Sequence, residues 1–189
     1  VKNGKWRRSE FKGTELSGKT IGIIGYGRLG KILSSYCKAL RMEVLAVDIN
    51  PTKEETNINY VALEDLLKNS DIISIHLPLD KNTHNFISSS EFSLMKKKPY
   101  LINTSRGEII DEKELIHHLE LGHIAGAALD VLCDEVNWSN EIPEDNIIYN
   151  YLNNDSDNLI VTPHIGGATN DSMEKTEVYI AKKIRLFCK

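Results

Sequence analysis

Short apolar runs alternate along the chain with longer stretches in which apolar residues recur every three or four positions. The short runs are rich in Ile, Val and Leu and are bounded by glycine, proline or polar residues, which is typical of buried strands. They lie at Thr20–Ile24, Val44–Val47, Asp71–Ile75, Tyr100–Asn103, Ala125–Leu129 and Leu159–Thr162, with a shorter one near Tyr60 and Val61. The longer stretches predict helices at Arg28–Leu40, Leu63–Lys68, Asp111–Leu121 and Asp171–Phe187, and Ser88 with Glu91 predicts a further capped helix start. Strands that alternate with helices predict an α/β fold, a doubly wound parallel sheet of the Rossmann type with six or seven strands.

One stretch, Asn137–Asn158, does not follow this alternation. It contains seven asparagines and shows little apolar periodicity. Asparagine favours turns and caps over regular elements, because its side chain competes for backbone hydrogen bonds. We therefore interpret the stretch as a loop insertion.

Composition and charge narrow the class of protein. The 189 residues are 41% hydrophobic and 26% charged, which is ordinary for a globular protein, and no apolar run is long enough for a membrane span. The net charge of −4 argues against nucleic-acid binding. Three scattered cysteines predict reduced thiols and no zinc site, and Val1–Glu10 has no apolar stretch of a secretory signal, so we expect a cytoplasmic protein.

The hexapeptide Gly25–Gly30 has the form G-x-G-x-x-G and lies between the first strand and the first helix. Gly25 permits a tight turn, Gly27 leaves room for a pyrophosphate to approach the backbone, and Gly30 allows the helix to pack closely on the strand. The free amides of the helix N-terminus then attract the anion. The alternative is a glycine turn with a purely structural role.

An acidic residue, Asp48, ends the second strand 18 residues after Gly30. This spacing is typical of a carboxylate that accepts hydrogen bonds from the adenosine ribose of a dinucleotide. Such a carboxylate repels a 2′-phosphate, so the sequence predicts NAD in preference to NADP.

Two further motifs follow strands and therefore lie at the carboxyl edge of the sheet, where open α/β folds bind ligands. Arg106 lies in Asn103–Gly107, and a guanidinium there can hold a carboxylate through two parallel hydrogen bonds. His164 follows Pro163 and precedes two glycines, and a histidine suits proton transfer to and from an alcohol oxygen. Glu135, a few residues after the strand that precedes Asp130, is a candidate to hold its imidazole.

Taken together, these separated motifs resemble the D-isomer-specific 2-hydroxyacid dehydrogenases, and the general appearance is closest to the phosphoglycerate dehydrogenase branch. The resemblance runs from the glycine turn through Asn103–Asp111 and Gly126–Asp130 to Pro163–Thr169. It implies hydride transfer between NAD and a small D-2-hydroxy acid or 2-keto acid, with 3-phosphoglycerate as one candidate. It also implies a homodimer formed through the cofactor domain.

The resemblance assigns roles to individual residues. Arg106 would bind the substrate carboxylate and carbonyl oxygen, His164 would be the general acid/base, and Glu135 would be its hydrogen-bonding partner. The residues implied to bind the cofactor are Gly25, Gly27, Arg28, Leu29, Gly30, Asp48, His76, Leu77, Pro78, Thr104, Ser105, Arg106, Asp130, His164, Gly166 and Gly167. Among these, Arg28 and Leu29 would lie against the pyrophosphate, the segment 76–78 would border the adenosine, and Asp130 would contact the nicotinamide carboxamide. No metal is implied.

The chain also departs from the family pattern. Val136 stands where the family usually has proline, and Asp134 directly before Glu135 is a competing carboxylate. We expect the second, substrate-binding domain of the family to have no counterpart in these 189 residues. We therefore expect residues 1–12 to be a linker, 13–170 the NAD-binding domain and 171–189 an exit helix, and we expect this fragment to bind NAD weakly without turnover.

Two other functions stay open at this stage. The family includes the C-terminal-binding-protein corepressors, so an NAD-sensing binding module is the main alternative. A domain for another dinucleotide or an adenylate is a third reading, and the combination of Arg106, Glu135 and His164 disfavours it.

Overall fold

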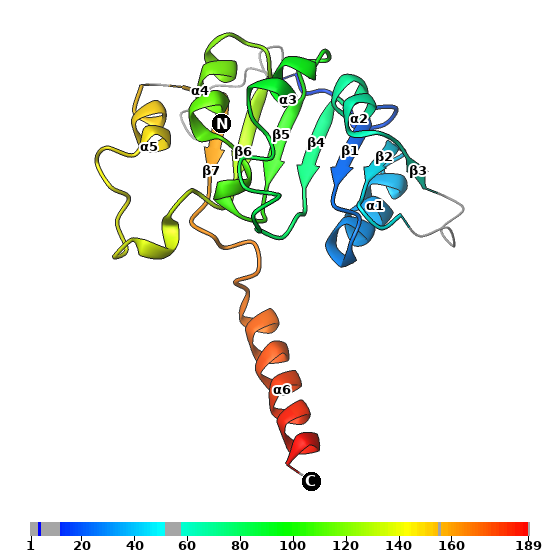
Figure 1. The fold of residues 1–189 in the computed structure, drawn as a ribbon, viewed down its shortest axis with the longest axis vertical. Coiled ribbons are helices and arrows are strands. Elements are labelled where there is room, and N and C mark those ends of the chain that lie inside the picture. Colours follow the sequence, from blue (N-terminus) through cyan, green and yellow to red (C-terminus); the bar gives the residue numbers. More distant parts are fainter. Residues whose placement is uncertain (1–3, 5–11, 52–57, 155, 189) are drawn as a thin grey trace.

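Seven parallel strands form one twisted sheet in the order β3-β2-β1-β4-β5-β6-β7, which confirms the predicted Rossmann fold (Figure 1). The computed structural model describes residues 4, 12–51, 58–154 and 156–188. The strands are β1 (Thr20–Ile24), β2 (Glu43–Val47), β3 (Asn59–Tyr60), β4 (Ile72–Ile75), β5 (Tyr100–Asn103), β6 (Gly126–Leu129) and β7 (Leu159–Val161). The strand order reverses between β1 and β4, and ligands of such sheets bind at this switch point.

The four helices predicted over 28–40, 63–68, 111–121 and 171–187 begin and end within one residue of those bounds. The helices of the structure are α1 (Arg28–Ala39), α2 (Leu63–Asn69), α3 (Ser89–Leu94), α4 (Glu112–Glu120), α5 (Ile147–Leu152) and α6 (Asn170–Phe187), with single 3-10 turns η1 (Gly107–Ile109) and η2 (Glu135–Asn137). The predicted capping box is present before α3, since Ser88 and Glu91 each accept a backbone hydrogen bond from the other. Asp111 caps α4 by accepting from the amides of Lys113 and Glu114.

Helices pack on both faces of the sheet, and neighbouring residues of β1 show how. A Cβ on Gly22 would lie 2.4 Å from Leu66 of α2, so this residue faces α2. Ile23 points to the opposite face, where its side chain lies 3.1 Å from the Cβ position of Gly30 in α1. The buried side chains accordingly form two clusters, a larger one that includes Leu66 and a smaller one that includes Ile23.

The prediction of a loop over Asn137–Asn158 was wrong in its second half. Helix α5 forms there because Asn146 caps it, with its side-chain oxygen accepting from the Tyr149 amide at 3.0 Å. Ile148 is fully buried in the larger cluster and Leu152 packs against it. Periodicity analysis misses this helix, because it contains too few buried apolar residues to form a repeating pattern.

The terminal helix α6 projects away from the sheet (Figure 1). None of its described side chains is buried, and Val178, Ile180 and Ile184 are among its exposed apolar residues. The helix predicted over Asp171–Phe187 is confirmed as an element, and its role as an exit helix stays a prediction. The predicted linker over 1–12 lies outside the described residues, apart from Gly4 and Lys12, and the limits of the predicted domains stay a prediction.

Within the described residues, no helix combines the length and the apolar character that crossing a membrane requires.

Candidate cofactor and catalytic site

The three glycines of the turn after β1 have different surroundings. Gly25 has φ +93°, and a Cβ there would lie 2.6 Å from the carbonyl oxygen of His76. A Cβ on Gly30 would lie 2.4 Å from the carbonyl oxygen of Gly25. Gly27 differs, because no atom of the described residues lies within 4 Å of its Cβ position. The fold thus requires glycine at two positions, whereas the third leaves open space beside the backbone.

The N-terminus of α1 borders this open space. Gly27 is the N-cap and supplies no side-chain cap, and the first turn carries no acidic residue. In the part of the chain that the structure describes, the amides of Arg28, Leu29 and Gly30 donate no hydrogen bond. These amides carry the partial positive charge of the helix N-terminus, which favours a bound anion.

Asp48 follows β2 and lies beside the glycine turn. One oxygen of its carboxylate accepts from the Tyr26 amide at 2.7 Å, and the other accepts from the Asn50 amide at 2.8 Å. Each oxygen retains a further lone pair, so the carboxylate can also accept from ribose hydroxyls. The open backbone at Gly27, the free amides and this carboxylate fit a dinucleotide diphosphate with its adenosine ribose.

The segment 76–78 closes the other side of the turn, directly after β4. The His76 backbone and the Leu77 side chain lie against Gly25. The His76 ring pairs with Ser74 Oγ at 2.9 Å, and burial lowers the pKa of His76. This segment is placed beside the predicted cofactor site, while its contact with adenosine stays a prediction.

Three further candidates follow neighbouring strands. Asn103, Leu129 and Val161 are paired across β5, β6 and β7 near their carboxyl ends. Arg106 follows β5, Glu135 follows β6 and His164 follows β7. The sheet register therefore brings these side chains to the same edge as the glycine turn.

Asn103 organises the loop that carries Arg106. Its buried amide donates to the Arg106 carbonyl at 2.8 Å, and its side-chain oxygen accepts from the amide and the hydroxyl of Ser105 at 3.0 and 2.7 Å. Thr104 and the Arg106 side chain are exposed, and Arg106 Nη1 donates to the Ser105 carbonyl at 2.6 Å. Sequence reasoning missed this role of Asn103, although an asparagine at a strand end before Ser-Arg-Gly is the signal of an Asx turn.

The Arg106 loop packs directly on the segment that leads to Glu135. A Cβ on Gly107 would lie 2.0 Å from the carbonyl carbon of Leu132 and 2.3 Å from the amide nitrogen of Cys133. The Cys133 amide donates to Glu112 Oε1 at 2.8 Å. Burial raises the pKa of Glu112, and burial with the neighbouring Glu112 carboxylate raises the pKa of the Cys133 thiol well above its ordinary value.

His164 and Glu135 form the predicted pair. His164 Nδ1 lies 2.5 Å from Glu135 Oε1, and Glu135 Oε2 accepts from the Leu132 amide at 3.1 Å. The carboxylate that faces the imidazole thus belongs to Glu135 and not to the competing Asp134, which has φ +58° and occupies the N-cap position of η2 without a side-chain capping hydrogen bond. Half of the His164 side chain is exposed, and no hydrogen bond to Nε2 is found within the described residues.

Asp130 holds the turn that presents His164. Its buried carboxylate accepts from the Thr162 hydroxyl at 2.5 Å and from the amides of Ile165 and Gly166 at 2.9 and 2.8 Å. Burial alone would raise the pKa of Asp130, but these hydrogen bonds, with the nearby His164, hold it below the ordinary value. They also keep His164 at φ +50°, a left-handed conformation that residues other than glycine seldom adopt. The predicted contact of Asp130 with nicotinamide stays a prediction.

The two glycines of this turn, Gly166 and Gly167, have different surroundings. A Cβ on Gly166 would lie 2.8 Å from the Asp130 carboxylate, whereas no atom in the described part of the chain lies within 4 Å of the Cβ position of Gly167. The first is therefore needed for the turn, and the second leaves space beside the strand ends. Their predicted contact with the cofactor follows from this position and stays a prediction.

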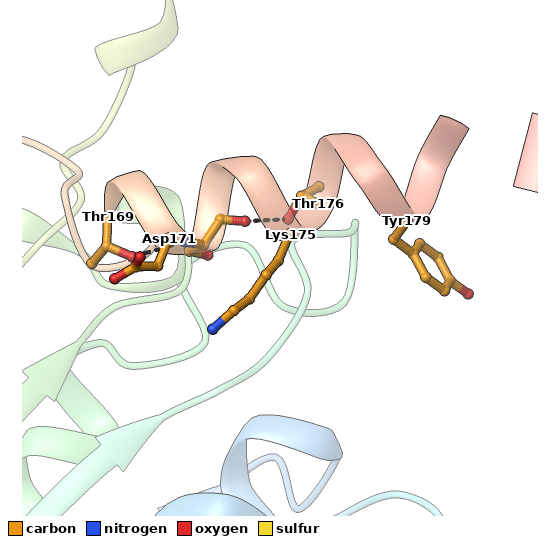
Figure 2. A pocket seen from close by; sticks show the side chains of 6 residues that line it. Thr169, Asp171, Lys175, Thr176 and Tyr179 are labelled. Atoms are coloured by element: carbon orange, nitrogen blue, oxygen red, sulfur yellow. Dashed lines mark hydrogen bonds between the residues drawn. The ribbon is translucent and has the colours of Figure 1, made fainter. Parts of the chain in front are cut away.

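A hollow of about 530 Å³ lies elsewhere, along α6 (Figure 2). It is lined by Thr169, Asp171, Ser172, Lys175, Thr176 and Tyr179. All six belong to α6 or its cap, so the described residues that line the hollow come from one element. The hollow contains none of the predicted site residues. No group of three or more metal-ligating side chains is present in the described ranges either.

Comparison with known proteins identifies the family. Residues 1–166 match the family model described as "D-isomer specific 2-hydroxyacid dehydrogenase, NAD binding domain". Glyoxylate reductase of Thermococcus litoralis is 38% identical over 199 residues, covering 100% of this chain and 57% of the relative. D-3-phosphoglycerate dehydrogenase of Archaeoglobus fulgidus is also 38% identical, over 97% of this chain and 34% of the relative. Sequence identity therefore does not separate the phosphoglycerate dehydrogenases from the related reductases.

Solved structures agree with this result. D-lactate dehydrogenase of Aquifex aeolicus, complexed with NAD and lactic acid, matches 99% of this chain and 58% of its own with a TM-score of 0.86 at 34% identity. D-lactate dehydrogenase of Lactobacillus jensenii with NAD⁺ matches 92% and 53% with a TM-score of 0.80 at 36% identity. The chain spans between a third and about three fifths of the length of these relatives. The chain belongs to the D-isomer specific 2-hydroxyacid dehydrogenase family, as the NAD-binding domain of that family.

Proposed function

We propose that this chain is the cofactor-binding part of an enzyme that interconverts a small D-2-hydroxy acid and its 2-keto form. The observation that carries the proposal is the pairing of His164 Nδ1 with Glu135 Oε1, at the sheet edge that also holds Arg106 and the open turn at Gly27. Bound NAD⁺ would accept the hydride, and bound NADH would donate it in the reverse direction. The residues of this chain would bind the reactants and move the proton.

The His164–Glu135 pair sets up the proton transfer. Because Glu135 accepts from Nδ1–H, the neutral imidazole has its free lone pair on Nε2. Nε2 can then take the hydroxyl proton of a 2-hydroxy acid, or return a proton to the oxygen of a 2-keto acid. General acid–base catalysis of this kind contributes about 10² to 10⁴ in rate.

Arg106 supplies the positive charge for the substrate. Its exposed guanidinium extends from a loop that Asn103 holds in place, and it offers donors in a planar arrangement that matches a carboxylate. It would hold the substrate carboxylate and polarise the carbonyl oxygen.

The cofactor contacts follow from the same geometry. The amides of Arg28, Leu29 and Gly30 would hold the diphosphate over Gly27, and Asp48 would accept from the adenosine ribose. The segment 76–78 would border the adenosine. Thr104, Ser105, Asp130, Gly166 and Gly167 would surround the nicotinamide end.

The names of the relatives support the substrate class. They include reductases named for glyoxylate and hydroxypyruvate and dehydrogenases named for 3-phosphoglycerate, which are small 2-keto or 2-hydroxy acids. We propose a substrate of this class, with 3-phosphoglycerate among the candidates. The comparisons lend no support to the corepressor alternative.

We further propose that a second domain completes the site. The support is that the chain covers 57% and 58% of its reductase relatives, and that α6 leaves the sheet with its apolar side chains exposed. A substrate held by Arg106 and His164 alone remains open to water. The fragment by itself should therefore bind NADH without turning over any 2-keto acid.

A homodimer is also proposed. Helix α1 and its C-cap carry four large apolar side chains, each half or more exposed, at Leu29, Ile32, Tyr36 and Leu40, and their spacing places them along one side of the helix. We propose a second copy of this chain as the partner of this stripe, in line with the homodimer that the family resemblance implies. Light scattering at tens of micromolar should give twice the chain mass, and Ile32→Glu should give one chain mass.

A cytoplasmic location is proposed from the cysteines. Cys37, Cys133 and Cys188 are all free thiols, as is usual in a reducing compartment. Fractionation of the source cells, with the chain recovered alongside a cytoplasmic marker, would support this location, and recovery in a secreted fraction would contradict it.

The proposed activity is tested on the full-length protein that contains this chain. A screen of small 2-keto acids that follows NADH absorbance should find a substrate, and His164→Ala should lower kcat by about 10² or more. Thermal melting and NADH affinity of the variant serve as controls for folding and cofactor binding. If His164→Ala reduced the best substrate as fast as the unaltered enzyme, the proposed role of the pair would be wrong.

A further inference from the structure

A pocket of about 440 Å³ lies directly against the His164–Glu135 pair. One wall is the end of β7 and the turn after it, including Val161. The other wall is the segment 135–142, in the part of the chain that departs from the family pattern after Glu135. Trp138 belongs to this wall and also packs against the larger buried cluster, so the wall is anchored to the core.

The chemistry of the lining restricts what the pocket can hold. Val161, Ile142 and Trp138 give it apolar surface, and Glu135 and Glu141 give it negative charge. None of the described residues that line it is Lys or Arg. Its volume lies within the range of about 300 to 1,000 Å³ that small-molecule sites occupy. A carboxylate ligand would meet like charges here, so the pocket does not suit the 2-keto acid substrate.

We propose that this pocket binds a small organic monocation with an apolar body, such as an aromatic or branched amine. The ammonium group would lie near the carboxylates of Glu135 and Glu141, and the apolar body would contact Trp138. An indole ring also attracts a cation through its π-face, which adds to the same preference.

Binding at this pocket does not depend on the proposed function. One consequence does rest on it: a cation beside Glu135 lies next to the carboxylate that orients His164. The occupied pocket is therefore placed to regulate proton transfer at Nε2, and binding itself is measurable without any turnover.

The test measures binding by the fluorescence of Trp138. The chain has two tryptophans, Trp6 and Trp138, so Trp6→Phe leaves Trp138 as the single tryptophan. This variant is titrated with three ligands of similar size, namely 2-phenylethylammonium, 2-phenylethanol and 3-phenylpropionate. Saturation-transfer NMR on the same samples detects binding independently of tryptophan emission. We expect saturable binding of the ammonium compound, weaker binding of the alcohol and the weakest binding of the carboxylate.

Two matched substitutions test the charge argument. Glu141→Gln should weaken binding of the ammonium compound by about 1.5- to 5-fold, as removal of an exposed ion pair does, and should leave the alcohol unaffected. Glu144→Gln changes an exposed acid two residues beyond this segment that does not line the pocket, and should change neither. The proposal is overturned if the carboxylate binds as tightly as the ammonium compound, if neither method detects saturable binding, or if the two variants behave alike.

Discussion

Replacing Gly27 by alanine separates cofactor binding from folding. Among the residues that the structure describes, none places an atom within 4 Å of the Cβ position of Gly27, and its φ of −77° is accessible to alanine. The domain should therefore fold normally. The loss at the N-cap of α1 is about 0.5 to 1 kcal/mol, because alanine is a poorer cap than glycine. That corresponds to a fall in Tm of at most about 4 °C for a domain of this size.

The cofactor should respond much more strongly. The added methyl group occupies the space through which a diphosphate approaches the free amides of Arg28 and Leu29. Loss of even one charge-assisted hydrogen bond costs about 1.5 to 3 kcal/mol, so the Kd for NADH should rise about 10-fold or more. NADH fluorescence titration gives the Kd, and thermal melting followed by circular dichroism gives the Tm.

Two control variants complete the experiment. Gly13→Ala also adds a methyl group in open space, but away from the turn in sequence, and should leave the Kd unchanged. Gly30→Ala should destabilise the fold itself, because its Cβ would lie 2.4 Å from the Gly25 carbonyl oxygen. The reasoning is refuted if Gly27→Ala binds NADH as tightly as the unaltered chain.

Four further predictions follow from individual contacts. Asp48→Ala should weaken NADH binding and narrow the preference for NADH over NADPH, as measured by parallel titrations; an unchanged ratio of the two Kd values would argue against the ribose contact. Cys133 should react with iodoacetamide more slowly than the exposed Cys188, because the pKa of the Cys133 thiol is raised. Glu112→Gln should speed the alkylation of Cys133 by removing a neighbouring negative charge. Peptide mass spectrometry measures both rates, and an unchanged rate in the variant would contradict the charge argument. The pKa of Asp130 is depressed in the folded chain, so its stabilising contribution is present above the ordinary value of 3.8 and is lost as the pH falls through the lower folded value. The difference in urea stability between the unaltered chain and Asp130→Asn should therefore shrink below about pH 4, and a difference independent of pH would contradict this. Finally, the isolated chain should oxidise no NADH with any 2-keto acid, and steady-state turnover would show that a second domain is not needed.

The parts of the fold that were predictable are those encoded by local patterns. Strands such as Thr20–Ile24 are short, apolar and bounded by glycine, and a buried parallel strand has that pattern wherever it occurs. The turn Gly25–Gly30 was predictable for the same reason, since all of its constraints lie within six residues and the flanking elements.

The parts that escaped prediction depend on contacts between distant residues. Asp130 shapes the His164 turn across more than thirty residues of sequence, with its partners Ile165 and Gly166 at separations of 35 and 36. Glu112 reaches the Cys133 amide over 21 residues. No local pattern marks a carboxylate as the acceptor for an amide in another loop. The choice between Asp134 and Glu135 was open for the same reason, because only the folded chain shows which one faces the imidazole.

Helix α5 illustrates a different limit. Its six residues contain only one fully buried side chain, Ile148, so periodicity has almost nothing to repeat. Its start depends on the Asn146 cap, and the surrounding asparagines make that cap inconspicuous. The asparagine-rich stretch 137–158 also contributes Trp138, Asn140, Glu141 and Ile142 to the pocket beside His164. The stretch that was hardest to interpret therefore lies next to the proposed catalytic pair.

Amide NMR of the isotope-labelled chain during titration with NADH tests the central claim most directly. If a diphosphate binds at the start of α1, the amide signals of Gly27 to Gly30 should shift most and saturate together with those after β7, around Gly166 and Gly167. Saturating shifts confined to the hollow along α6, or no saturating shifts at the glycine turn, would contradict it.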